Sequence, residues 1–162
     1  MLGNKAYNSA AWINDQGQII TMYRKHYRYY TDLTWSTPGP GFSNISLSPF
    51  GNIGLGICMD LNHEIDLSEQ EMLRDWYQPP FATWHAKHNT QFIVLLMNWL
   101  KSDEELPFQE PKEPSWRNLE YWCRRLAPLV ESRVPREHPV IVVTCNRTGA
   151  ERGTFLLPFS IH

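Results

Sequence analysis

The sequence predicts an α/β domain built around a sheet of buried strands. Three apolar runs carry this prediction: Ile53–Cys58, Phe92–Met97 and Val140–Thr144. None of them alternates strictly with polar residues, which is typical of strands that are covered on both faces. A helical pattern separates the second run from the third, and strands that alternate with helices favour a layered arrangement. We therefore expect the three runs to form the centre of the sheet.

The first element expected along the chain is a β-hairpin. Tyr7–Ile13 and Gln18–Tyr23 are rich in β-forming residues and flank "NDQG", which suits a tight turn. From Arg24 to Pro49 we expect one long irregular loop, because "STPGPGF" within it holds two prolines and two glycines. Long loops in compact domains usually have a functional reason, so we expect this loop to line a site.

Two helices are expected after the first apolar run. The weaker pattern covers Ala82–His88. The stronger pattern begins after Ser115, a suitable N-cap, and should end or kink just before Pro128, whose ring crowds the preceding turn. Apolar residues recur along it at three- or four-residue steps, the stripe of an amphipathic helix: Trp116, Leu119, Trp122, Leu126 and Leu129.

Length and composition fit one globular domain over residues 1–162. Hydrophobic residues make up 42% of the chain and charged residues 20%, and the formal net charge of −2 gives no electrostatic reason to expect nucleic acid. The longest strongly apolar run, Phe92–Met97, is far shorter than the roughly 20 residues of a membrane-spanning helix. The opening "MLGNKAYNSAAW" has no apolar stretch of signal-peptide length. We expect a cytosolic or nuclear protein with no membrane and no nucleic-acid partner.

Cys58 is the candidate nucleophile. It stands where an apolar run gives way to a turn, a position from which a side chain projects from a sheet edge into a cleft. The other two cysteines, Cys123 and Cys145, are widely spaced, and an odd total indicates reduced thiols. A thiol needs a nearby positive charge or base to become a thiolate, and Lys25 is the candidate for that charge. With Lys25, the backbone amide of Met59 is the candidate to stabilise the oxyanion that forms during attack on a carbonyl.

Five strings of the sequence resemble the nitrilase or carbon-nitrogen hydrolase superfamily and follow one another in the same order. They are "YNSAAWINDQGQIITMYRKHYRYYTDLTW", "PGPGF", "GLGICMDLN", "IVLLMNWL" and "CNRTGAERGTF". The resemblance extends from Tyr7 to Phe155. The pieces "YRK…YYTD…W" and "GICMDLN" are most similar to the fungal protein N-terminal amidases, which deamidate an N-terminal Asn or Gln of a protein.

The resemblance implies a fold and a reaction. The fold would be a partial four-layer αββα sandwich of the nitrilase type, and the chemistry would use a Glu-Lys-Cys triad in which Lys25 matches the lysine and Cys58 the nucleophile. The thiolate would attack an amide carbonyl, ammonia would leave, and water would hydrolyse the thioester. The implied partners are a protein or peptide N-terminus bearing Asn or Gln, another small amide, or a second copy of the chain. No cofactor and no metal are implied.

The sequence departs from the family pattern at the triad glutamate. That residue should precede the lysine on an earlier segment, yet no Glu or Asp occurs before Asp15, which lies in the expected turn. A further acidic residue that members often carry between lysine and cysteine is not evident, since Asp32 is the only carboxylate there. We interpret the chain as incomplete at both ends. General-base assistance is typically worth about 10² to 10⁴ in rate, so we expect poor activity.

A non-catalytic role is the first alternative. In it the chain is an interaction or oligomerisation partner, Cys58 is a core residue, Lys25 is solvated, and exposed aromatic side chains bind the partner. These aromatic residues are Tyr27, Tyr29, Tyr30 and Trp35.

A cysteine-histidine hydrolase is the second alternative, with His63, His85 or His88 as the base for Cys58. Surface histidines are the ordinary expectation for all three. His85 and His88 have helix-face spacing, but two ligands without a third are a weak metal signal.

Three further polar or thiol groups are expected to be structural. Cys145 follows a strand, as Cys58 does, and we interpret it as a packing residue. Asp60 and Asn62 are expected to bond to turn amides rather than to substrate.

Overall fold

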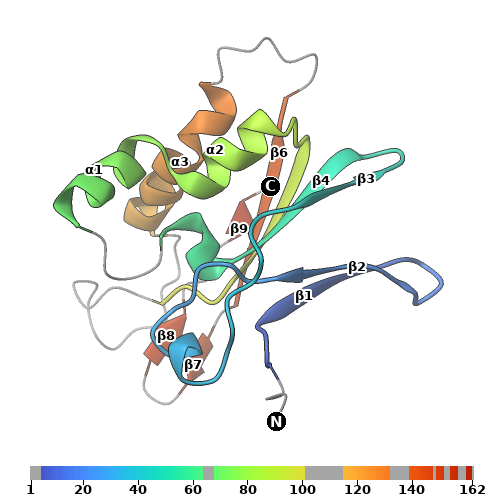
Figure 1. Ribbon diagram of the computed structural model, residues 1–162, viewed down its shortest axis with the longest axis horizontal. Helices are drawn as coiled ribbons and strands as arrows, with labels where there is room; N and C mark the ends of the chain where they lie inside the picture. The colour runs from blue at the N-terminus through green and yellow to red at the C-terminus, as the bar shows by residue number, and fades with distance from the viewer. Residues whose placement is uncertain are drawn as a thin grey trace.

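The structure, a computed structural model, is a layered α/β arrangement with helices over one face of a five-stranded sheet and a β-hairpin against the other face (Figure 1). The α/β class expected from the sequence is confirmed. The structure describes residues 5–63, 68–100, 115–131, 139–147, 149–151, 154–156 and 160–161.

The central sheet contains all three apolar runs. Its strand order is β3-β4-β5-β6-β9, in which β4, β5 and β6 pair in parallel and the two outer strands are antiparallel to their neighbours. The strands are β3 (Asn44–Leu47), β4 (Gly51–Ile57), β5 (Phe92–Met97), β6 (Ile141–Asn146) and β9 (Ser160–Ile161). The prediction that the three runs are central is therefore confirmed, and the parallel pairing brings the carboxyl ends of β4, β5 and β6 to one edge of the sheet.

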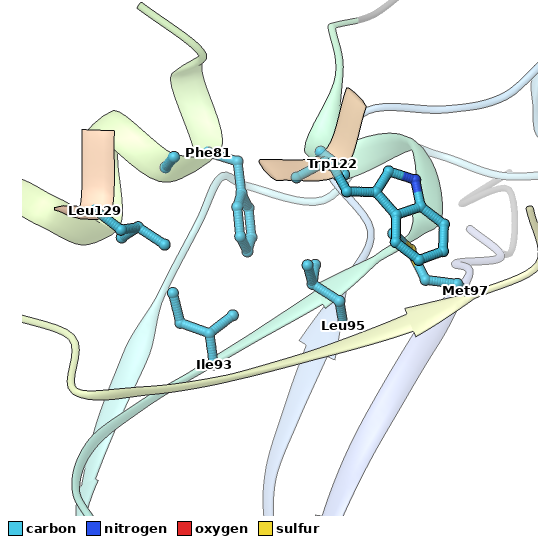
Figure 2. Close-up of a cluster of buried hydrophobic side chains, with 8 residues drawn as sticks. Phe81, Ile93, Leu95, Met97, Trp122 and Leu129 are labelled. Carbon is cyan, nitrogen blue, oxygen red and sulfur yellow. The ribbon is translucent and has the colours of Figure 1, made fainter. Parts of the chain in front are cut away.

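Helices cover one face of this sheet (Figure 1). The helical elements are η1 (Asp32–Thr34), η2 (Cys58–Leu61), α1 (Glu69–Tyr77), α2 (Pro80–Lys87) and α3 (Trp116–Val130), of which η1 and η2 are short 3-10 turns. Alternate residues of β5 point toward α2 and α3, and Figure 2 shows the resulting cluster of buried side chains. Its labelled members are Phe81, Ile93, Leu95, Met97, Trp122 and Leu129.

Two glycines allow α2 to approach β4 closely. A Cβ atom at Gly54 would lie 2.4 Å from Cε1 of His85, and one at Gly56 would lie 2.7 Å from Cε2 of Phe81. Both of these α2 side chains are fully buried, so neither has room to move aside. The glycines of "GNIGLG" therefore serve the packing of helix on sheet.

The hairpin packs on the opposite face of β4. Ala10 and Tyr23 contact Leu55 and Ile57, whose side chains alternate with the two glycines. The hairpin strands of the structure are β1 (Ser9–Ile13), β2 (Ile19–Arg24), β7 (Gly149–Glu151) and β8 (Thr154–Leu156). The first pair is the hairpin expected from the sequence, and it adds a second β layer to the sheet.

The prediction of one long irregular loop from Arg24 to Pro49 is wrong in part, because β3 lies within this segment. β3 pairs with β4 from Asn44 to Leu47. The segment is short and follows the glycines and prolines of "STPGPGF" closely, which hid its strand character. Pairing with the edge of β4 satisfies backbone groups that an irregular loop would leave to water.

The long helix was expected to end or kink just before Pro128, and the prediction of an end there is wrong. Ser115 is the N-cap, since its Oγ accepts a hydrogen bond from the Asn118 amide, but α3 continues through Pro128 to Val130. The proline lies in the last turn, where its missing amide removes a single hydrogen bond. Leu129 is buried in the core one residue later, and that burial favours continuing the helix.

Helix α1 was not predicted from the sequence. Its N-terminus carries a capping box, in which the Ser68 Oγ accepts from the Glu71 amide and the Glu71 carboxylate accepts from the Ser68 amide. The "SEQE" pattern contained this signal. Its apolar residues Met72, Leu73, Trp76 and Tyr77 also recur at four-residue spacing, although no residue of α1 is buried.

Across the described part of the chain, no helix combines the length and the apolar character that a membrane crossing requires.

Replacing Gly56 with Ala tests the close packing of α2 on the sheet. The added methyl would meet Leu95 and Phe81 at less than 3.0 Å, and such overpacking typically costs about 1–3 kcal/mol of unfolding free energy. Urea denaturation followed by circular dichroism should show the loss. Ser46→Ala, at an exposed position of β3, is the matched control and should change stability by less than about 0.5 kcal/mol. A Gly56→Ala protein as stable as the unsubstituted chain would contradict this account.

Candidate active site

A cleft of about 520 Å³ lies beyond the carboxyl ends of β4 and β5. Side chains that follow these two strands line one side of it, and the loop after β2 lines the other. Lys25, Asp32, Cys58, Met59, Asn98 and Trp99 all contribute to its walls. All three residues singled out from the sequence, the cysteine, the lysine and the methionine, thus border one cavity, at the sheet edge where ligands bind in open α/β sheets.

Cys58 occupies the first position of η2, directly after β4. Its backbone has a φ of 44°, in the left-handed region that residues other than glycine seldom adopt. This conformation turns the chain sharply at the end of the strand and presents the half-buried thiol to the cleft. Burial raises the pKa of the Cys58 thiol above its ordinary value, although a hydrogen bond from the Asn98 backbone amide and the charge of Lys25 lower it in part.

Lys25 is buried and paired. Only 4% of the side chain is exposed, and its Nζ lies 2.5 Å from Oδ2 of Asp32. The same oxygen of Asp32 accepts a hydrogen bond from the Tyr29 amide, and Oδ1 accepts from Nδ2 of Asn8. The interaction-partner alternative requires a solvated Lys25, and that prediction is therefore wrong.

Asp32 is the acidic neighbour of the lysine that was not evident from the sequence. Burial alone would raise the pKa of Asp32, but the hydrogen bonds from Lys25 and the Tyr29 amide and the ammonium charge outweigh burial and lower the pKa. Asp32 therefore stays ionised and holds the ammonium of Lys25 at the cleft. Among the described residues that line the cleft, Asp32 is the one carboxylate.

Asp60 joins the segment that carries Cys58 to the segment that carries Lys25. Its Oδ1 accepts from the backbone amides of His26 and Tyr27, and its Oδ2 accepts from the Ile57 amide and the Tyr23 hydroxyl. Asp60 is fully buried, and burial raises its pKa against the lowering effect of these bonds. The expectation that Asp60 binds turn amides is confirmed.

Helix α3 supports the turn after Cys58 from the other side. Nε of Arg125 donates to the Leu61 carbonyl, and the rest of its guanidinium pairs with Asp75 of α1. The Tyr121 hydroxyl donates to Oδ1 of Asn62 at 2.7 Å. Asn62 thus bonds to a side chain and also lines the cleft, so the expectation that it bonds turn amides is not met.

No histidine lies beside Cys58 among the described residues that line the cleft, which removes the support for a cysteine-histidine pair. His85 is fully buried on α2, contrary to the expectation of a surface residue, and its Nδ1 lies 2.9 Å from the Thr90 Oγ1. Burial lowers the pKa of His85 to about 3. His88 stacks on Trp84, and the described residues contain no group of three His, Cys, Asp or Glu side chains placed to hold a metal ion.

The third cysteine and the aromatic residues of the expected binding patch agree with the sequence predictions only in part. Cys145 is exposed on β6, so its interpretation as a packing residue is wrong. In the aromatic group proposed as a binding patch, Tyr30 and Trp35 are exposed. Tyr27 instead stacks on His63, and Tyr29 lines the cleft.

Asn98 and Trp99 are functional candidates that the sequence reasoning missed. Both follow β5 directly and line the cleft. The string "MNW" contains the signal, because polar and aromatic residues that follow a buried parallel strand meet those that follow its neighbour.

Comparison with known proteins places these features in context. No protein-family model matches the chain. A protein N-terminal amidase of Schizosaccharomyces pombe is 33% identical to it over 153 residues, which is 90% of this chain and 51% of that protein. The chain thus spans about half the length of this relative.

Solved structures share the fold. A crystal structure of N-terminal amidase with an Asn-Glu-Ala peptide matches with a TM-score of 0.65 at 18% identity, over 94% of this chain and 65% of that chain. A crystal structure of N-terminal amidase with a Gln-Gly peptide gives 0.64 at 18% identity, with the same coverage of 94% and 65%. A carbon-nitrogen hydrolase from Helicobacter pylori G27 gives 0.59 at 22% identity, over 93% of this chain and 46% of that chain. The nitrilase-type arrangement expected from the sequence is therefore confirmed.

Asp60→Asn is expected to destabilise the protein. An amide side chain has one acceptor oxygen where the carboxylate has two, so at least one of the four donors would lose its partner at a cost of about 1–3 kcal/mol. The thermal unfolding midpoint should fall by several degrees, since about 1 kcal/mol corresponds to about 2–4 °C for a chain of this size. Asp15→Asn, in the exposed hairpin turn, should leave the midpoint unchanged. An equally small effect of both substitutions would show that Asp60 does not join the two segments.

Asp32→Asn is expected to flatten the acid side of the stability profile. Because the pKa of Asp32 is lowered on folding, its carboxylate stabilises the protein above the ordinary pKa of 3.8, and this contribution is lost as the pH falls through the lowered pKa. Unfolding midpoints measured from neutral pH down to about pH 2 should therefore fall less steeply in Asp32→Asn than in the unsubstituted chain. Asp15→Asn again serves as the control. Parallel profiles for the chain and its Asp32→Asn variant would contradict the assignment.

Proposed function

The chain belongs to the carbon-nitrogen hydrolase superfamily as a relative of the protein N-terminal amidases, and on that premise we propose that residues 1–162 form a single domain that hydrolyses carbon-nitrogen bonds of non-peptide amides. The substrate we propose is the side-chain amide of an N-terminal Asn or Gln. The cytosolic or nuclear location and the pairing with a second copy stay predictions from the sequence.

The observation that carries the proposal is the convergence of a thiol and a buried ammonium on one cleft. Cys58 projects from the end of β4, and Lys25 reaches the same cavity from the end of β2. A lysine with 4% of its side chain exposed is held in place by Asp32 and is not a solvated surface charge. A positive charge that faces a thiol is what a cysteine nucleophile requires, because it stabilises the thiolate.

The proposed reaction has two steps. In the first, the Cys58 sulfur bonds to the amide carbon, the carbon-nitrogen bond breaks, and the nitrogen leaves as ammonia with the thiol proton. In the second, water attacks the thioester, releases the carboxylic acid and restores the thiol. The Lys25 ammonium and the Met59 amide are the donors we propose for the oxyanion of both steps. The left-handed backbone at Cys58 supports the second donor, because successive amides around such a residue point into one concavity.

The substrate class is supported by the relatives and by the walls of the cleft. N-terminal amidase has been crystallised with Asn-Glu-Ala and with Gln-Gly peptides. In this chain the residues that line a cleft of about 520 Å³ include Asn8, Asn62, Asn98 and Trp99. Side-chain amides donate and accept hydrogen bonds at once, which suits an amide substrate.

The proposed chemistry also predicts slow turnover. Burial raises the pKa of Cys58, so the resting group is a neutral thiol whose proton must be removed. Asp32 is a weak base, because its pKa is lowered and Lys25 already occupies one of its oxygens. The described residues that line the cleft offer no stronger base, so we expect the rate to lack the factor of about 10² to 10⁴ that general-base assistance typically provides.

Cys58→Ala is expected to abolish ammonia release from an Asn-Glu-Ala peptide, because the sulfur that forms the thioester is gone. Ammonia should be measured over hours with a coupled assay, against the unsubstituted chain. Cys123→Ser and Cys145→Ser remove exposed thiols and are the matched controls, which should keep full activity. A peptide with Asn at its second position should release no ammonia. Equal ammonia release by Cys58→Ala and the unsubstituted chain would overturn the proposed function.

A further inference from the structure

The Asn146 side chain continues the pairing of β5 with β6 beyond the end of the strands. The backbone ladder ends where the Arg147 amide donates to the Met97 carbonyl. One step further, Oδ1 of Asn146 accepts from the Trp99 amide at 2.8 Å, and its Nδ2 donates to the Trp99 carbonyl at 3.3 Å. A side-chain amide offers a donor and an acceptor in one plane, so it replaces a peptide group of a neighbouring strand. The segment that follows β5 is thereby fixed although it is no longer in the sheet.

The fixed segment contacts the candidate nucleophile. β4 and β5 are in register at Ile57 and Leu96, so Cys58 leaves β4 beside Met97, the residue before Asn98. Both residues line the cleft, and the Asn98 backbone amide is close enough to the Cys58 sulfur to lower the pKa of the thiol. Asn98 itself is exposed and is held on its C-terminal side by Trp99, whose two backbone groups both bond to Asn146.

The Trp99 ring has a separate support from α3. Its Nε1 donates to Oδ1 of Asn118 at 3.2 Å, and Nδ2 of Asn118 donates to the Ser115 Oγ. The ring also meets Trp122 edge-on at a centroid distance of 5.7 Å. Asn118 therefore holds the side chain of Trp99 and Asn146 holds its backbone, so the two contributions are separable by substitution.

We propose that Asn146 is a positioning residue for the nucleophile: by clamping the Trp99 backbone it holds the Asn98 amide against the Cys58 sulfur. This inference rests on the proposed function, in which Cys58 is the nucleophile. Asn118 has a different task, which is to hold the indole ring of Trp99, a residue that lines the cleft. The clamp belongs to β6, two strands away from the cysteine.

The experiment measures the reactivity of the thiol and does not depend on turnover. The rate of alkylation of Cys58 by iodoacetamide follows the thiolate fraction, and peptide mass spectrometry resolves Cys58 from the exposed Cys123 in the same sample. A hydrogen bond to the charged form favours that form. Loss of the clamp in Asn146→Ala should therefore slow Cys58 alkylation about tenfold near neutral pH and move its pH profile upward by about one unit, with no change at Cys123.

Asn118→Ala is the matched control, since it removes the bond to the indole and leaves the backbone clamp intact. It should keep the alkylation profile of the unsubstituted chain and raise the KM for an Asn-Glu-Ala peptide. The charged groups that act on Cys58, namely Lys25, Asp32 and Asp60, are present in both variants. An unchanged Cys58 profile in Asn146→Ala, or an equal shift in both variants, would overturn the inference. Failure of the proposed function is a different result, namely ammonia release that survives Cys58→Ala.

A measurement on the unsubstituted chain covers the case in which Asn146→Ala does not fold. The amide resonance of Asn98 should move with pH in step with the Cys58 titration observed by alkylation. Absence of that movement would overturn the inference, and its presence in the chain but not in Cys58→Ala would support it.

Discussion

The rest of the site depends on the buried carboxylate of Asp60. Backbone amides after β2 and at the end of β4 point inward, away from water, where an amide without an acceptor is costly. Asp60 accepts from three of them and from the Tyr23 hydroxyl, so one side chain fixes the segments that carry Lys25 and Cys58. These segments are 33 residues apart in the sequence, and Asp60 joins them in addition to the packing of the hairpin on β4 and the stacking of Tyr27 on His63.

The sequence was sufficient for the parts of the fold that follow from local patterns. The three apolar runs predicted the central strands, and "NDQG" predicted the hairpin, because periodicity and turn chemistry act over a few residues. β3 and the end of α3 were missed because tertiary contacts decide them: β3 forms against the edge of β4, and burial of Leu129 carries the helix past Pro128. Helix α1 was missed although its capping box and the four-residue spacing of its apolar side chains were visible in the sequence.

For the candidate site, the sequence was sufficient to find the thiol and the lysine but not the side chains to which they are hydrogen-bonded or near which they are held. Cys58 and Lys25 were found from position and from resemblance, and both border the cleft. The pairing of Lys25 with Asp32 was not found, because a carboxylate seven residues along an irregular loop gives no periodic signal. Asn146 was also missed, since its connection to Cys58 passes through two strand registers that only the folded sheet defines.

The left-handed backbone at Cys58 lowers the stability of the fold at the same residue whose thiol the proposed reaction needs. A side chain at a φ of 44° carries conformational strain that glycine would not have, and the buried contacts around the turn must sustain it. Substitution by glycine would relax this strain but remove the thiol, so random mutagenesis selected for heat resistance alone would favour losing the nucleophile. Among descendants of this sequence, the best-folded molecules need not be the reactive ones.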